Sequence, residues 1–264
     1  MRRMMTGLAV LAGVLAMGGT AMAAPRAAAA HPAPRASAGD AAAIAELAND
    51  PKYGPVWRDL QATYPGQMNG LLEAALAARR SGTPWPQVKR EFMAKAAELW
   101  AADLPEAAKA PSAELQAYSH AYGELFRAMR AAGDIKGCAG AAMGTMSNDE
   151  ASNIYEVDTQ MIALVRSLLA AIRAARAHPT VHGAVTAPDV MAMVETMHGT
   201  GAPGFAPADL RGLTSAPPAV QCDTGIAMME ALAVMEPEGG GRFLAAILPG
   251  MAANLRDPNR GRKP

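Results

Sequence analysis

Cysteine is scarce in this sequence, and aromatic side chains are few. Cys138 and Cys222 are the only cysteines among 264 residues, and aromatic residues make up 5% of the chain. Two cysteines cannot form the dense framework of bridges typical of small secreted scaffolds, and without C-x-x-C spacing they match neither a redox motif nor a haem attachment site. The pair instead predicts one structural disulfide, with two unrelated buried thiols as the alternative. Closing a loop of about 85 residues would stabilise the fold by roughly 4 to 5 kcal/mol in the chain-entropy model.

Apolar runs long enough to cross a membrane are also missing. The apolar run at residues 8–17 is too short for about 30 Å of hydrocarbon. It follows Arg2 and Arg3 and precedes a small-x-small motif that ends at Ala23, which is the pattern of a secretory signal peptide. We therefore predict a signal peptide over residues 1–23 and no membrane span after its cleavage.

No cysteine lies near the predicted cleavage site, so a lipid anchor at the mature amino terminus is excluded. The Arg2-Arg3 pair is the ordinary opening of a signal peptide, but it is also compatible with twin-arginine export of a prefolded protein. Either route leads to a periplasmic or secreted protein. Such an oxidising compartment favours the predicted disulfide.

The sequence has no excess of charge of either sign. Its 24 basic residues balance 24 acidic ones, and loss of Arg2 and Arg3 with the signal peptide would leave 22 against 24, a net charge near −2. This balance provides no field to attract nucleic acid, so no nucleic-acid partner is expected. The one basic cluster lies in residues 256–264, which we interpret as a basic disordered tail.

Helical periodicity dominates the remaining chain. Residues 24–39 are rich in Ala and Pro and predict a flexible leader. Residues 40–255 predict a single all-α, bundle-like domain of about seven to nine helices, because apolar residues recur at spacings of three and four and sustained alternation is absent. A break near residues 177–186 could separate two lobes, but Cys138 and Cys222 lie on opposite sides of it, which favours one domain.

Caps and apolar stripes mark the individual helices. Thr83-Pro84 begins one helix, and Ser112 begins a second that should end near Gly133. Ser147 and Glu150 form a capping box for a third, which should run to Pro179. The predicted buried stripes of these three helices are Trp85, Val88, Phe92, Ala96 and Leu99; Leu115, Tyr118, Tyr122, Leu125, Phe126 and Met129; and Ile154, Val157, Met161, Val165, Leu168 and Ile172.

Further helices are predicted over residues 68–78, 187–198, 218–235 and 241–255. Pro249 should kink or end the last of these, because proline lacks the amide donor and clashes with the preceding turn. The best strand candidate is the stretch from Thr180 to Thr186.

The common catalytic and metal signatures are absent. The sequence contains no G-x-S-x-G, no H-E-x-x-H and no phosphate-binding loop. Glu195 and His198 form one Glu-x-x-His pair, whereas di-iron bundles need two such pairs. His178 and His182 lie four apart, but Pro179 disfavours a helix between them, so a loop metal site is only an alternative to a solvent-exposed pair. His120 falls on the polar side of its helix. No metal or cofactor is therefore assigned.

Methionine is the compositional exception, with 18 residues. Met191, Met193 and Met197 lie close to His198, and thioether and imidazole ligands suit Cu(I), so these four residues are the candidates for a soft-metal site. Methionine also fills helical cores, and Met191 and Met193 point about 200° apart on a helix. Core packing is the preferred interpretation.

These observations favour a non-enzymatic binding or interaction module of the cell envelope. It would contact another protein or a small ligand through an exposed helical face or the Gly/Pro-rich loop at residues 199–218. That loop contains Phe205, Asp209, Arg211 and Thr214. The alternatives are soft-metal binding through the Met/His residues and an envelope hydrolase that uses carboxylates on facing helices, for which Glu91 and Glu156 are the candidates.

The predicted cleavage and disulfide can be tested together. The mass of the protein recovered from its native source should correspond to residues 24–264 with both cysteines oxidised, because the signal peptide is removed on export to an oxidising compartment. Mass spectrometry before and after thiol alkylation makes both measurements. An intact amino terminus together with two alkylated cysteines would contradict both expectations.

Overall fold

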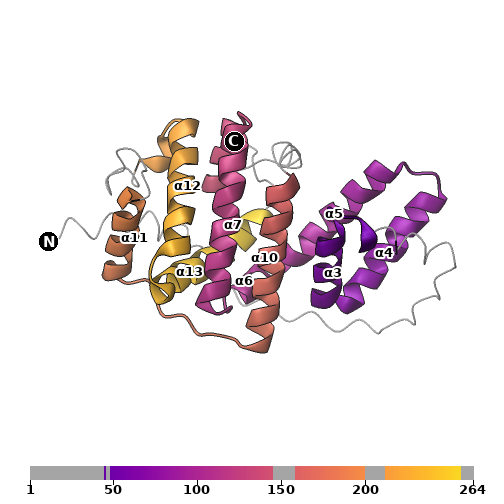
Figure 1. Cartoon of the computed structure of the whole chain (residues 1–264), viewed down its shortest axis with the longest axis horizontal. Helices are drawn as coiled ribbons and strands as arrows, with labels where there is room; N and C mark the ends of the chain where they lie inside the picture. Colours follow the sequence, from indigo (N-terminus) through magenta and orange to yellow (C-terminus); the bar gives the residue numbers. More distant parts are fainter. Residues whose placement is uncertain (1–44, 46–47, 145–157, 200–211, 257–264) are drawn as a thin grey trace. The chain divides into compact units, whose positions relative to one another are not determined.

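The computed structural model describes residue 45 and residues 48–144, 158–199 and 212–256 (Figure 1). These residues form ten α-helices and no strand, which confirms the all-α prediction. The predicted signal peptide and leader lie outside the described residues. Of the predicted tail only Arg256 is described, and it ends the last helix.

The chain divides into two compact units, with the boundary between Ala97 and Glu98 inside helix α5 (Trp85–Ala102). The predicted break at residues 177–186 is not this boundary, because both of its sides belong to the larger unit. That unit also holds both cysteines. Whether residues 40–255 fold as one domain stays a prediction.

The smaller unit contains α3 (Gly54–Thr63), α4 (Pro65–Arg80) and most of α5. The Trp57 ring packs against Phe92 with ring centroids 5.3 Å apart. Among the stripe residues predicted for α5, Val88 and Ala96 are buried. Pro65 begins α4, which extends the predicted 68–78 helix at both ends, whereas α3 was not predicted. The buried side chains among the described residues of this unit are Val56, Trp57, Leu60, Thr63, Tyr64, Met68, Ala75, Leu76, Val88 and Ala96.

Helix α7 (Ser112–Ala131) is the central element of the larger unit. It packs against α8 (Ile135–Met143), α10 (Asp158–Ala177), α12 (Pro218–Val234) and α13 (Pro237–Arg256), and α12 and α10 lie on either side of it in Figure 1. Gly133, with φ 82°, follows α7 as predicted. The apolar stripe predicted for α7 is buried at Leu115, Tyr118, Leu125, Phe126 and Met129, which confirms the predicted core face of this helix.

The remaining predicted helices are present with adjusted ends. The capping box at Ser147 and Glu150 lies outside the described residues, and α10 is seen from Asp158 onward. Val165, Leu168 and Ile172 are buried on it as predicted. The predicted 187–198 helix is α11 (Ala187–Gly199), and the unit also contains the short α6 (Leu104–Ala107) and a 3₁₀ turn, η3 (Leu213–Ser215).

The disulfide between Cys138 and Cys222 is present and joins α8 to α12. Both cysteines are 0% exposed. Asp134 caps α8 by accepting a 2.9 Å hydrogen bond from the Gly137 amide, and Gly144, with φ 66°, ends the helix. The covalent link therefore lies inside the core, between two well-delimited helices.

The strand prediction is wrong, and one of the two effects expected of Pro249 does not occur. Residues 180–186 form an irregular segment rather than a strand: the Thr180 amide donates to the Lys109 carbonyl at 2.7 Å, but no ladder follows. Pro249 does not end its helix, since α13 starts earlier than predicted, at Pro237, and continues to Arg256. Pro249 itself is exposed, and a kink at this residue stays a prediction.

Within the described residues, no helix combines the length and the apolarity that crossing a membrane requires.

Two buried glycines inside helices provide a matched test of this packing. A Cβ added at Gly225 of α12 would lie 2.5 Å from the Ala142 Cβ, whereas one added at Gly123 of α7 would meet its nearest atom at 3.5 Å. We expect G123A to be neutral or to stabilise by up to about 1 kcal/mol, since alanine is the better helix former. G225A should destabilise by about 1 to 3 kcal/mol, because neither backbone can yield without moving a helix.

Urea unfolding followed by circular dichroism measures both variants. Equal stability of G225A and G123A would contradict the close approach of α8 and α12.

Candidate functional site

The most polar buried region begins at the start of α11, where Thr186 and Asp189 form a capping box. The Thr186 amide and hydroxyl each donate to Asp189 Oδ2 at 2.8 Å, and the Asp189 amide donates to Thr186 Oγ1 at 3.4 Å. These bonds satisfy amides that have no partner within the first helical turn. The T-x-x-D spacing in the sequence is the signal that could have revealed this cap.

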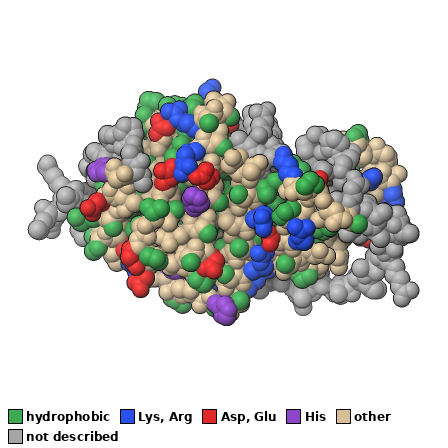
Figure 2. All heavy atoms as spheres, in the orientation of Figure 1, with side chains coloured by type: hydrophobic (Ala, Val, Ile, Leu, Met, Phe, Trp, Pro, Cys, Tyr) green, Lys and Arg blue, Asp and Glu red, His purple; other side chains and the backbone are tan. Residues whose placement is uncertain are grey.

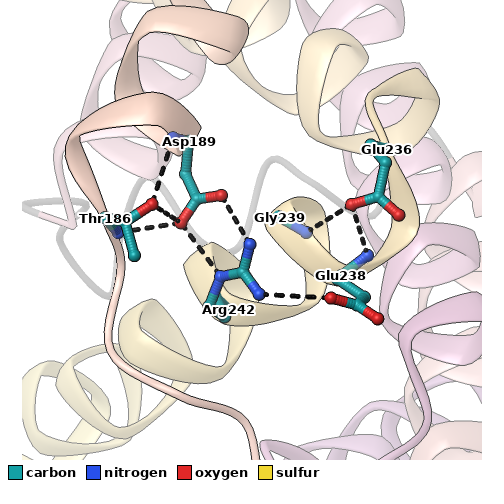
Figure 3. A network of polar contacts seen from close by, with 6 residues as sticks. All are labelled: Thr186, Asp189, Glu236, Glu238, Gly239 and Arg242. Atoms are coloured by element: carbon teal, nitrogen blue, oxygen red, sulfur yellow. Dashed lines mark hydrogen bonds and ion pairs between the residues drawn. The ribbon is translucent and has the colours of Figure 1, made fainter.

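Arg242 of α13 binds the same carboxylate with two hydrogen bonds. Its Nε donates to Asp189 Oδ2 at 2.9 Å and its terminal nitrogen to Oδ1 at 2.6 Å, so the planar guanidinium meets the carboxylate side on (Figure 3). The Asp189 side chain is 7% exposed and that of Arg242 24%. Sequence analysis assigned no role to either residue, because they are 53 positions apart.

This ion pair keeps both groups charged. The hydrogen bonds from Arg242 lower the pKa of Asp189 far below its usual value, against the opposing effect of burial, and the bonds from Thr186 add to the lowering. The hydrogen bond to Asp189 likewise raises the pKa of Arg242. Asp189 is therefore ionised at any physiological pH, and its carboxylate oxygens accept hydrogen bonds from other residues of the same chain.

Three successive glycines allow α13 to reach this position. A Cβ at Gly239 would lie 3.1 Å from Asp189 Oδ1, and one at Gly240 would lie 2.9 Å from the Leu232 carbonyl oxygen. At Gly241 it would collide with Ser112 Oγ and lie 3.1 Å from His182 Nδ1. The first turn of α13 is thus in close contact with the start of α7 and with the segment that leads into α11.

We call this convergence of the first turns of α7, α11 and α13 the amino-terminal junction. Each helix brings the positive end of its dipole, and a carboxylate stands in the first turn of each or just before it. Glu114 lies in the first turn of α7, and Glu236 accepts from the Glu238 and Gly239 amides at 3.1 and 3.2 Å at the start of α13. In α11, Asp189 stands in the first turn and accepts from the amide of Thr186, which precedes the helix. The chain's own carboxylates therefore occupy positions that would otherwise attract an anionic ligand.

His182 lies in the same region, and its side chain forms a hydrogen bond with the backbone. Its Nε2 lies 2.8 Å from the Ala110 carbonyl oxygen. Since a carbonyl can only accept, Nε2 carries the hydrogen and donates. His178, by contrast, is exposed, and so is His120, as predicted. His182 Nε2 is thus already engaged by the backbone, whereas the His178 side chain is exposed.

The four candidates for a soft-metal site are divided between two sides of α11. Met193 and Met197, one helical turn apart, are 1% and 0% exposed and belong to the core, whereas Met191 is 73% exposed. His198 and Glu195 are exposed. Among the described residues, no group of three or more His, Cys, Asp or Glu side chains is placed to hold a metal ion.

Of the two carboxylates considered for a hydrolase, only Glu91 lies in the described part of the chain. Glu91 is exposed and accepts a 2.9 Å hydrogen bond from Gln87 of its own helix. Glu156 lies outside the described residues, as do Phe205, Asp209 and Arg211 of the Gly/Pro-rich loop. Thr214 lies in η3 and is exposed.

Comparison with protein-family models, with curated proteins and with solved structures gave no match.

The Asp189–Arg242 pair predicts a specific acid sensitivity. D189N should destabilise the protein by about 2 kcal/mol, less than the loss for a fully buried pair because Arg242 keeps some exposure. The folded-state pKa of Asp189 is below its unfolded-state value, so the stabilisation is present above the ordinary aspartate pKa of about 4 and is lost as the pH falls below it.

Urea unfolding of the wild type and D189N between neutral and acidic pH makes this measurement. The stability difference should shrink only in the acidic range. E238Q is the matched control, because Glu238 is 80% exposed and lies 3.6 Å from Arg242, and it should change stability little. A difference between wild type and D189N that stays constant down to the lowest pH would refute the ion pair.

Proposed function

We propose that this chain is an exported helical protein, periplasmic or secreted, that works by binding another protein or a small ligand and not by catalysis. The observation that supports this proposal most is the state of Asp189, the one charged residue in the described part of the chain that is buried. It is fully engaged by Arg242 and Thr186. A catalytic acid needs a raised pKa and a base needs a free lone pair facing substrate, whereas this carboxylate has a lowered pKa and holds two helices together.

The other strongly shifted buried group also points to structure. Burial raises the pKa of Tyr118 well above its usual value, and the neighbouring Tyr122 adds to the shift, so the phenol stays neutral in the core of α7. The rings of Tyr118, Tyr122 and Phe126 stack along α7 with centroids 5.7 and 4.5 Å apart. Perturbed pKa values often mark catalytic sites, but here they follow from packing.

Export is supported by the disulfide. A bridge between Cys138 and Cys222 persists most readily in an oxidising compartment, and the predicted signal peptide would deliver the chain there. The two lines of support are independent, since one comes from the core and the other from the amino terminus.

The outer face of α11 is the binding surface that we propose. Met191, Glu195 and His198 are exposed at spacings of four and three, so they share one side of the helix, opposite buried Met193 and Met197. Figure 2 shows hydrophobic, acidic and histidine side chains close together over the α11 end of the larger unit. An exposed methionine among polar groups suits binding, because its unbranched thioether adapts to different partners.

Site-specific cross-linking tests the proposal. A photoreactive amino acid placed at Met191 in the full chain, expressed in its native host, should give discrete adducts with a partner. The same group at His120, which is exposed on α7, is the matched control and should not give them. M191E should reduce the yield of the adduct formed from a probe at Glu195 by about tenfold, the effect of losing roughly 1.4 kcal/mol of contact. Identical products from both probe positions, or none from either, would contradict binding through α11.

A further inference from the structure

The disulfide is inaccessible once the protein is folded. Cys138 and Cys222 are 0% exposed, and the chain neighbours of Cys138, Gly137 and Ala139, are also buried. One turn along α12, Gly225 lies so close to Ala142 of α8 that the two helices touch through small side chains. The sulfur atoms are therefore enclosed between helices in close contact.

Disulfide formation requires space that this packing does not provide. A protein thiolate attacks one sulfur of an oxidant disulfide, and a mixed disulfide forms in which the oxidant is attached to the chain. The second protein thiolate then attacks the chain-side sulfur, the chain disulfide forms, and the oxidant leaves as a dithiol. The chain loses two electrons and two protons, and the oxidant gains them. Neither the attack nor the bulky intermediate fits between α8 and α12 in the folded state.

We propose that a disulfide-bearing oxidoreductase of the exporting compartment joins Cys138 to Cys222 while the chain is still unfolded, before α8 packs onto α12. This inference rests on the proposed export. The proposal also distinguishes between the two possible export routes. A chain that folded in the reducing cytosol, before export, would bury both thiols before it met the oxidant. This order of events fits export of the unfolded chain and not twin-arginine export of a folded one.

Thiol protection tests the order of events. The full chain is reduced in urea, returned to buffer with reductant, and examined by circular dichroism. After the reductant is removed, the rate of reaction with a small aromatic disulfide is measured in buffer and in urea. V181C, prepared with the native disulfide intact, supplies the reference rate for an open thiol on the folded protein, because Val181 is 98% exposed.

The expected result is that the native thiols react on the order of a hundredfold more slowly than the V181C thiol in buffer and equally fast in urea, since a buried thiol reacts only from a locally opened state. If the reduced chain stays unfolded, oxidation necessarily precedes folding, and the proposal is equally supported. A reduced chain that folds and whose thiols react within about tenfold of the V181C thiol overturns it.

This measurement is independent of the proposed export. An intact amino terminus and reduced cysteines in the protein taken from its native host would refute export, and the protection measured in the purified chain would be unchanged.

Discussion

The larger unit depends on helix backbones that approach one another closely. Its core is rich in small residues, and Ala107, Ala110, Ala171, Ala175 and Ala231 are each at most 1% exposed. A buried alanine removes little apolar surface from water, so the stabilisation per residue is small unless the helices come near enough for their backbones and larger side chains to make contact. The helices approach one another most closely at two places: where Gly225 meets Ala142, and at the three glycines at the start of α13.

Close approach has an electrostatic consequence at the amino-terminal junction. Bringing the first turns of α7, α11 and α13 together concentrates partial positive charge in a region of limited solvent access. Asp189, Glu114 and Glu236 offset that charge, and Arg242 then balances Asp189, the most deeply buried of the three carboxylates. The ion pair is thus a result of the packing. Its perturbed pKa needs no catalytic role to account for it.

Sequence reasoning recovered the features that depend on local periodicity. The stripe of α7, the end of that helix near Gly133 and the pairing of the two cysteines were all predicted and are confirmed. The contact between Asp189 and Arg242 could not be predicted from the sequence. The two residues are 53 positions apart, and no local sequence pattern indicates a tertiary contact. At Pro249 the local rule predicted a kink or a helix end, and α13 continues past this exposed proline to Arg256. The division of Met191 from Met193 and Met197 followed from helical geometry alone.

A core of small side chains also explains the position of the disulfide. Since α8 spans only nine residues, it would be marginal in water as an isolated helix. Linking it to α12 through Cys138 restricts the unfolded chain and so favours the packed state. The link lies between two helices in close contact, where no oxidant can reach it. The same close packing that makes the brace useful therefore requires that it be formed first.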